Sequence, residues 1–144
     1  MQAARVILQE ALDDLGSALI TGDWDGFLAR IDLPFEMQTD TATIHVTRAD
    51  DMRDGYDRFR EFIFLRRVTD YVRLVETAAF DGPDTLSGSY VSHLLSNGTW
   101  VVPPYRSLMV LRRRDADWFA CRIVANLQND RWPILTPHPS EKGA

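Results

Sequence analysis

The stretch "ITGDWDGFLARIDLPFEMQT", residues 20–39, predicts two helices that meet at a glycine corner. Gly22 suits the end of the first helix, because glycine readily adopts the left-handed conformation found there. Asp23 is a good N-cap for a short second helix, and Pro34 stops that helix because its ring disfavours helical geometry in the preceding residue. The apolar residues of this second helix lie on one face: Trp24, Phe27, Leu28 and Ile31.

The segment before the corner, residues 4–20, has the apolar spacing of one amphipathic helix. Its apolar residues recur every three or four positions: Leu8, Ala11, Leu12, Leu15, Ala18 and Leu19. Acidic side chains such as Glu10 and Asp13 occupy the other face. Two helices joined at a corner must bury their apolar faces against something else, which the rest of the chain has to supply.

After the corner, residues 42–46 form a predicted short strand, followed by a third helix. Thr47 and Asp50 have the spacing of a capping box, and the helix they open runs to about Val68. Its apolar face is formed by Met52, Tyr56, Phe59, Phe62 and Ile63. Gly55 costs about 1 kcal/mol relative to alanine inside a helix, which suggests close packing there.

Four long strands then follow, and they form an antiparallel meander: residues 71–80, 85–96, 99–113 and 118–128. The turns between them are predicted at 81–84, at Asn97-Gly98 and at 115–117. Pro103 and Pro104 cannot donate to a strand ladder, so we expect a bulge or an unpaired edge there. The element order predicts an α+β fold in one domain, residues 1–130, followed by a proline-rich tail, residues 131–144, whose last residues we expect to be disordered.

Composition excludes several classes of protein. With 45% hydrophobic and 26% charged residues, the chain of 144 residues is typical of a soluble globular domain. It has no apolar run near the roughly 20 residues of a membrane helix and no secretory signal pattern. Cys121 is the only cysteine, so no internal disulfide is possible, and we expect a small buried side chain in a cytoplasmic protein.

Charge and motif content exclude further functions. A net charge of -5 argues against nucleic-acid binding, and the basic run 112–114 is expected to be a solvated strand end. Three histidines and one cysteine show no metal-ligand spacing, and no phosphate loop or serine-elbow motif occurs. We therefore expect no metal, no cofactor, no nucleic-acid partner and no membrane partner.

Three segments carry a resemblance to a known family: "GDWDGFLARID" (22–32), "TRADDMRDGYDRF" (47–59) and "DADWFACRIVANLQ" (115–128). With the element order over residues 4–128, the chain resembles the NTF2-like superfamily and, within it, the SnoaL-like (polyketide cyclase-like) group. The resemblance implies a cone of three N-terminal helices packed on a curved antiparallel sheet of about four long strands plus one or two short ones. It further implies that the sheet wraps around the third helix, that a mostly apolar pocket opens at one end, and that a homodimer forms through the outer sheet faces.

Ketosteroid-isomerase-like chemistry is not favoured by the residues at the matching positions. Enzymes of that type use a carboxylate base with acidic oxyanion donors. The tyrosine of the first helix in such enzymes corresponds to a position near Leu15, and the carboxylate base to a position near Gln38. Leucine cannot donate a hydrogen bond, and glutamine cannot act as a base. Glu36 lies two positions away, on the same side of a strand as Gln38 if no bulge intervenes.

Other polar residues on the predicted strands and helices remain as candidates. His93 is the candidate base, with Tyr56 or Tyr90 as proton donor; alternatively His93 is hydrogen-bonded to a neighbour or lies on the dimer face. Residues 90, 92 and 94 share one strand face, and 91, 93 and 95 the other. The candidate ligand-binding residues are Arg122, Asn126, Phe59 and Trp24. Arg122 suits an anionic ligand or a carboxylate on an adjacent strand.

Two hypotheses about function follow. In the first, the cone binds a small, largely apolar molecule, and any catalysis is cofactor-free acid–base chemistry of the isomerase, cyclase or hydrolase type. In the second, the protein is a non-catalytic dimeric accessory or interaction subunit, as in the small subunits of ring-hydroxylating oxygenases, with "RRVTDY" (66–71) placed to contact a partner. A catalytic cone would leave His93 facing open space, whereas a packed cone would leave it hydrogen-bonded and inaccessible.

Overall fold

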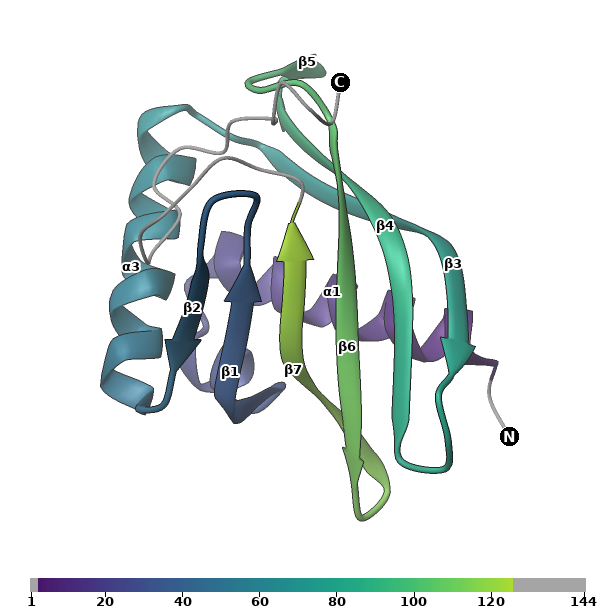
Figure 1. Cartoon of the computed structure of the whole chain (residues 1–144). Coiled ribbons are helices and arrows are strands. Elements are labelled where there is room, and N and C mark those ends of the chain that lie inside the picture. Colours follow the sequence, from purple (N-terminus) through teal and green to yellow (C-terminus); the bar gives the residue numbers. More distant parts are fainter. Residues whose placement is uncertain (1–2, 126–144) are drawn as a thin grey trace.

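A computed structural model of the chain describes residues 3–125, which fold into three helices and seven strands (Figure 1). The elements are α1 (Ala4–Thr21), α2 (Trp24–Leu28), β1 (Ile31–Gln38), β2 (Thr43–Val46), α3 (Ala49–Leu65), β3 (Asp70–Phe80), β4 (Thr85–Ser96), β5 (Thr99–Trp100), β6 (Tyr105–Arg114) and β7 (Asp117–Ala125). The predicted domain end at 130, the tail 131–144 and the candidate residue Asn126 lie outside the described residues.

The strands form one curved sheet in the order β2-β1-β7-β6-β4-β3, with β5 paired to the end of β4. The predicted antiparallel meander is confirmed, because β3, β4, β6 and β7 follow one another as antiparallel neighbours. The prediction of a wholly antiparallel sheet is wrong at one pair: β1 and β7 run parallel. A long connection through β2, α3 and the meander separates these two strands in sequence, so the chain can return in either direction.

The predicted end of α1 at Gly22 and the predicted N-cap of α2 at Asp23 are confirmed. Gly22 has a left-handed φ of 81°, and the Asp23 side chain accepts a hydrogen bond of 2.9 Å from the Gly26 N–H. The second helix ends earlier than predicted, at Leu28, so Pro34 does not stop a helix but lies inside β1. The pairing of β1 with β7 shifts register over residues 31–36, around a proline that has no N–H to give to a ladder.

The predicted capping box of α3 is wrong. Arg48 is the N-cap and makes no side-chain capping bond, so the helix begins one residue later than a box opened by Thr47 requires. Asp50 and Asp51 in the first turn stabilise the helix start through its dipole instead. The helix ends at Leu65, close to the predicted end.

The turns and the proline break agree with the sequence. Asn97 and Gly98 have φ angles of 49° and 85°, as in a tight hairpin between β4 and β5. Pro103 and Pro104 separate β5 from β6, so the predicted strand 99–113 is two strands. Cys121 is buried in β7, as predicted.

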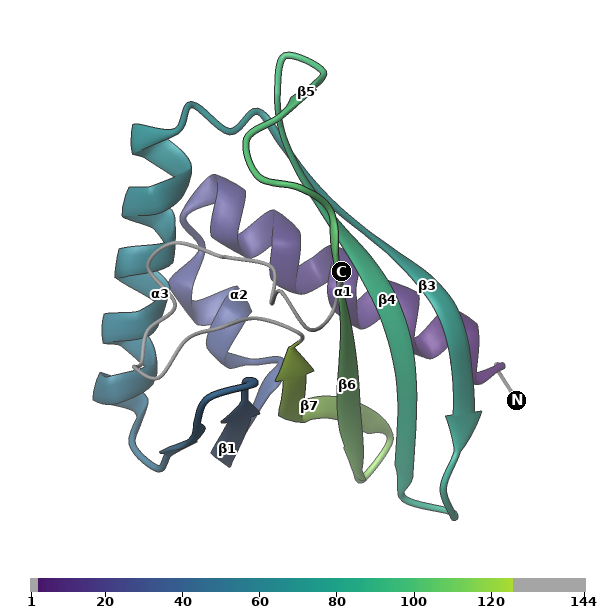
Figure 2. The same cartoon turned by 45° about the horizontal axis from the view of Figure 1, so that its top comes forward.

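The core lies between α1 and the inner face of the sheet (Figures 1 and 2). From α1, Leu8 and Leu12 are almost fully buried, and they belong to one cluster with Leu86 and Leu111 of the sheet. The resemblance implied that the sheet wraps around the third helix, but α1 lies along the sheet and α3 stands to one side, next to β2 (Figure 1). The cone is therefore closed on one side by α1 and on another by α3.

The close packing of α1 against the sheet depends on Gly88 in β4. A β-carbon at this position would lie 2.5 Å from Leu8 Cδ2 and closer still to the Thr77 carbonyl oxygen. We expect Gly88→Ala to lower the free energy of unfolding by about 1–3 kcal/mol, since overpacking forces the backbone to shift. Urea denaturation followed by circular dichroism measures this loss.

Gly16→Ala is the matched control, because its β-carbon would meet its nearest neighbours at an ordinary 3.6 Å. It lies within α1, where alanine favours the helix by about 1 kcal/mol over glycine. We expect Gly16→Ala to be as stable as the wild type or more stable. Equal loss in the two variants would contradict the close approach of α1 at Gly88.

Candidate functional site

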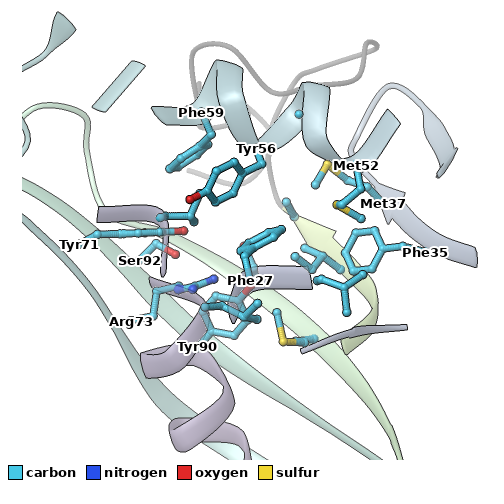
Figure 3. A pocket seen from close by; sticks show the side chains of 18 of the residues that line it. Phe27, Phe35, Met37, Met52, Tyr56, Phe59, Tyr71, Arg73, Tyr90 and Ser92 are labelled. Carbon is cyan, nitrogen blue, oxygen red and sulfur yellow. The ribbon is translucent and has the colours of Figure 1, made fainter. Parts of the chain in front are cut away.

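A pocket of about 120 Å³ lies between the sheet and the three helices, beyond the end of the filled core (Figure 3). Most of its apolar lining comes from α2, α3 and three strands, β1, β6 and β7. This part of the lining includes Phe27, Phe35, Met37, Met52, Met109 and Ile123. Leu15 and Leu19 of α1 close the pocket on the side of the core.

The polar lining residues gather at one end of the pocket, opposite Phe35, Met37 and Met52 (Figure 3). They come from β3, β4 and β6: Tyr71, Arg73, Tyr90, Ser92, Tyr105 and Ser107. Strand register explains why they meet. Arg73 is paired with Ser92, and Ser92 in turn with Tyr105, while Tyr90 is paired with Ser107 in the next inward-facing row.

Arg73 is the charged residue of this group, and only 6% of it is exposed. Its Nη2 donates a 3.0 Å hydrogen bond to the Leu12 carbonyl of α1. The guanidinium carbon lies 4.6 Å from the centre of the Tyr71 ring and 5.9 Å from that of Tyr90, which are cation–π distances. Burial lowers the pKa of Arg73, but the neighbouring tyrosines outweigh this effect and raise it, so the guanidinium stays charged.

The hydroxyls of Tyr90 and Tyr105 are held protonated. Burial raises the pKa of Tyr90 to about 12, although Arg73 and a hydrogen bond with Ser107 act in the opposite direction. Burial also raises the pKa of Tyr105 well above its usual value, against a hydrogen bond with Ser92. These hydroxyls are therefore suited to donate hydrogen bonds and not to remove protons at neutral pH.

Tyr56 lines the pocket from α3, but its hydroxyl already has a partner. It donates a 2.9 Å hydrogen bond to the Ala18 carbonyl, and burial raises its pKa. Its ring packs against Trp24 and Phe27 at centroid distances of 5.2 and 5.1 Å. Tyr56 thus ties α3 to the end of α1 at the pocket wall.

His93 does not line the pocket. It lies on the opposite face of β4 from Tyr90 and Ser92, where its Nδ1 accepts a 3.2 Å hydrogen bond from the Trp100 indole. The strand parity predicted for residues 90–95 is confirmed, and this parity turns His93 outward. The structure therefore does not bring the candidate base together with Tyr56 and Tyr90.

The candidate ligand-binding residues are also divided. Phe59 lines the pocket, whereas Trp24 packs behind the lining residues Phe27 and Tyr56. Arg122 is absent from the pocket lining: its Nε lies 2.7 Å from Glu36 Oε2 and its Nη2 donates a 2.7 Å hydrogen bond to Gln38. This ion pair is the carboxylate alternative considered for Arg122.

The candidate residues chosen from the sequence do not include five polar residues of the lining: Tyr71, Arg73, Ser92, Tyr105 and Ser107. The sequence contained a signal for Arg73: it lies two positions from both Tyr71 and Val75 on β3, so the three side chains share one face of the strand. No local pattern reveals the strand register that places Ser92 and Ser107 at the same end of the pocket. Strand pairing, not any local motif, assembles this end of the pocket.

Within residues 3–125, no carboxylate and no histidine lines the pocket. In the same part of the chain, no three histidine, cysteine or acidic side chains are grouped as a metal site would require. None of the described helices is long and apolar enough to cross a membrane. The polar chemistry of the described pocket is therefore that of one guanidinium and several hydroxyls.

The raised pKa of Tyr90 predicts a dependence of stability on pH. The unfolded chain loses this proton near pH 10 and the folded chain near 12, so the free energy of unfolding falls as pH rises between these values. The slope from this one group is at most about 1.4 kcal/mol per pH unit. Tyr90→Phe should make the fall shallower in urea denaturation series from pH 9 to pH 11.5; equal slopes would contradict a buried, protonated hydroxyl.

Comparison with known proteins identifies the fold. No family profile and no curated protein matches the sequence. Among solved structures, an NTF2-like protein of unknown function from Shewanella oneidensis has a TM-score of 0.65 at 10% identity, over 82% of this chain and 94% of that one. A ketosteroid isomerase-like protein from Erwinia carotovora has a TM-score of 0.59 at 14% identity, over 87% and 96% of the two chains.

A protein of unknown function from Mycobacterium tuberculosis is also similar, with a TM-score of 0.60 at 16% identity, over 89% of this chain and 72% of that one. At these identities the likeness concerns the fold, and it agrees with the α+β cone predicted from the sequence. The narrower resemblance to the SnoaL-like group stays a prediction. The fold of this chain is the NTF2-like fold.

Proposed function

We propose that the protein binds a small, mainly apolar molecule in the pocket of its cone. The observation that supports this function is the division of the pocket into an apolar part and one polar end, which is the usual character of small-molecule sites. Its volume of about 120 Å³ is near that of the roughly 150 Å³ cavities that take up benzene. The ligand is thus expected to have the size of a single ring or a short branched chain.

The lining favours binding over acid–base catalysis. A general base must reach the reacting proton and be unprotonated near neutral pH. The ionisable groups that line the described pocket are Arg73 and tyrosines, and burial raises the pKa of Tyr56, Tyr90 and Tyr105. His93, the candidate base, lies on the other face of the sheet, so we assign the donors at the polar end to orienting a ligand.

Filling the pocket tests this proposal. Ile123 lies on β7 between Met37 and Met109, in the apolar part of the lining. We expect Ile123→Trp to abolish the stabilisation that ligands from a panel of hydrophobic ketones, epoxides and aromatic acids give to the wild type. That stabilisation should reach about 2.7 kcal/mol at a ligand concentration of 100 times Kd, and thermal-shift and urea denaturation series measure it.

Ile123→Val is the control at the same position, because it leaves the pocket open at a cost of about 0.5–1.5 kcal/mol in stability. It should retain the ligand response, as should His93→Ala. A response that survives in Ile123→Trp would place the ligand elsewhere. The absence of any response in the wild type would contradict the proposal.

We also propose that the protein is a homodimer joined through the outer face of the sheet. On that face Leu74 is 53% exposed, Val72 is 39% exposed and Trp100 is 56% exposed, within one region of β3 to β5. Exposed apolar groups gathered in this way are typical of protein–protein contacts. The proposal agrees with the dimer that the family resemblance implied.

A single charge on this face should disrupt such a dimer. Leu74→Glu is expected to give a monomer, because it buries an unpaired carboxylate in the interface. Sedimentation equilibrium measures the mass. Phe64→Glu is the matched control, since Phe64 is 80% exposed at the end of α3 and away from the sheet, and it should remain dimeric. A dimer in both variants would contradict the proposed interface.

The accessory-subunit function remains the second candidate, and one observation favours it. Phe64 and Leu65 are 80% and 66% exposed at the end of α3, directly before the basic pair Arg66 and Arg67. This exposed apolar pair adjoins the segment 66–71 that the sequence suggested as a contact with a partner. A wild type that responds to no ligand would favour this function over binding in the cone.

A further inference from the structure

The guanidinium of Arg73 is the most buried positive charge described in this protein, and it has no anionic partner among the described residues. Within residues 3–125, no carboxylate lies within 4.0 Å of its side-chain nitrogens. Its Nε is buried and has no hydrogen-bond partner in the same range of residues. The neighbours that stabilise the charge are uncharged: the Leu12 carbonyl, the Tyr71 and Tyr90 rings, and the Tyr90 hydroxyl through a hydrogen bond.

Other arginines of the chain are treated differently. Arg112 and Arg114 both pair with the buried Asp32, at 2.9 and 2.7 Å. Arg106 pairs with Glu76, and Arg122 with Glu36, on the outer face of the sheet. Carboxylates thus pair with arginines that are partly exposed to water and need a partner least. No carboxylate of residues 3–125 pairs with the buried Arg73.

This arrangement is costly unless an anion completes it. Removing an ion from water costs several kcal/mol in a protein, and cation–π contacts return about 0.5–2 kcal/mol each. A guanidinium has five N–H donors, of which one on Nη2 is used in the bond to the Leu12 carbonyl. The remaining donors are next to the pocket, which Arg73 lines (Figure 3).

The groups around Arg73 are hydrogen-bond donors of the kind that carboxylates accept. Ser92 and Ser107 are 2% and 5% exposed, and both line the pocket beside Tyr90 and Tyr105. Their hydroxyls have protons to give, and no acidic side chain in residues 3–125 lines the pocket to repel an anion. Charge-assisted hydrogen bonds from a guanidinium to a carboxylate are among the strongest available to a ligand.

We infer that the ligand of this pocket is a small apolar monocarboxylate, whose carboxylate binds Arg73 and whose hydrocarbon part lies among Met37, Met52 and Met109. The inference rests on the proposed function and specifies its ligand class. The carboxylate accepts hydrogen bonds from the guanidinium and from hydroxyls at the polar end. One charged group and one ring or branched chain fill a pocket of about 120 Å³.

Pairs of ligands that differ only in charge test this inference on the wild type. The probes are benzoate, cyclohexanecarboxylate and isovalerate, each compared with its primary amide by isothermal titration calorimetry at pH 7. The best acid should bind about ten- to a hundredfold more tightly than its amide, as a charge-assisted hydrogen bond predicts. Equal affinities, or tighter binding of the amides, would overturn the inference.

Arg73→Met tests the residue itself, because it keeps the length of the side chain and removes its charge. It should lose the preference for acids while retaining the amides, and without ligand it should be as stable as the wild type or more stable. Arg106→Met removes a charge from the outer face and should keep the preference. A preference that survives in Arg73→Met overturns the inference; if that variant does not fold, the acid-to-amide ratio of the wild type decides alone.

The outcomes separate this inference from the function on which it rests. Amides that bind the wild type but not Ile123→Trp, without any advantage for the acids, would leave binding in the pocket intact and reject the carboxylate. Binding by neither acids nor amides would reject both. Acids that bind Ile123→Trp as tightly as the wild type would show an anion site outside the pocket and also overturn the inference.

Discussion

The close approach of α1 to β4 at Gly88 determines where the core of this protein is filled. Because Gly88 has no side chain, Leu8 reaches the inner face of the sheet and the first half of α1 fills the cone there. The second half of the helix continues past the filled region, so Leu15 and Leu19 become walls of the pocket. One helix thus provides both a dense core and one side of a cavity.

Arg73 lies at the boundary between these two halves. Its bond to the Leu12 carbonyl attaches β3 to α1 where the core ends, and its remaining donors are beside the pocket. A packed apolar side chain at this position would be expected to cost the fold nothing, since buried charges rarely improve stability over apolar groups of similar size. The presence of this charge in the lining of the pocket is therefore better explained by binding than by stability.

Much of the fold could be predicted from the sequence, because it depends on local signals. Gly22 and Asp23 specify the helix corner, and Asn97 with Gly98 specifies a hairpin, through conformations that few other residues adopt. The parallel pairing of β1 with β7 was missed because it joins segments distant in sequence. Pro34 was misread as a helix stop, since a proline excludes helix equally well from inside a strand.

The candidate site was harder to predict, since it depends on which face of each strand points inward. Parity along β4 puts Tyr90 and His93 on opposite faces but does not say which face lines the pocket; His93 was chosen for its chemistry and lies on the outer face. Arg73 was overlooked because an arginine in a strand is usually solvated. Its burial follows from the position of α1 above β3, which no local pattern in β3 reveals.

A β-bulge in β3 lets residues on both sides of it face the inner side of the sheet, toward the pocket and toward the core. The pairing of β3 with β4 shifts between Val75 and Thr77, so Glu76 is an extra residue on β3. On one side of it Arg73 faces the pocket, and on the other Ala78 pairs with Gly88 beneath α1. In a regular strand Arg73 and Ala78, which are five positions apart, would face opposite sides of the sheet, since side chains alternate along a strand. The bulge therefore allows one strand to present a charge to the pocket and a small residue to the helix.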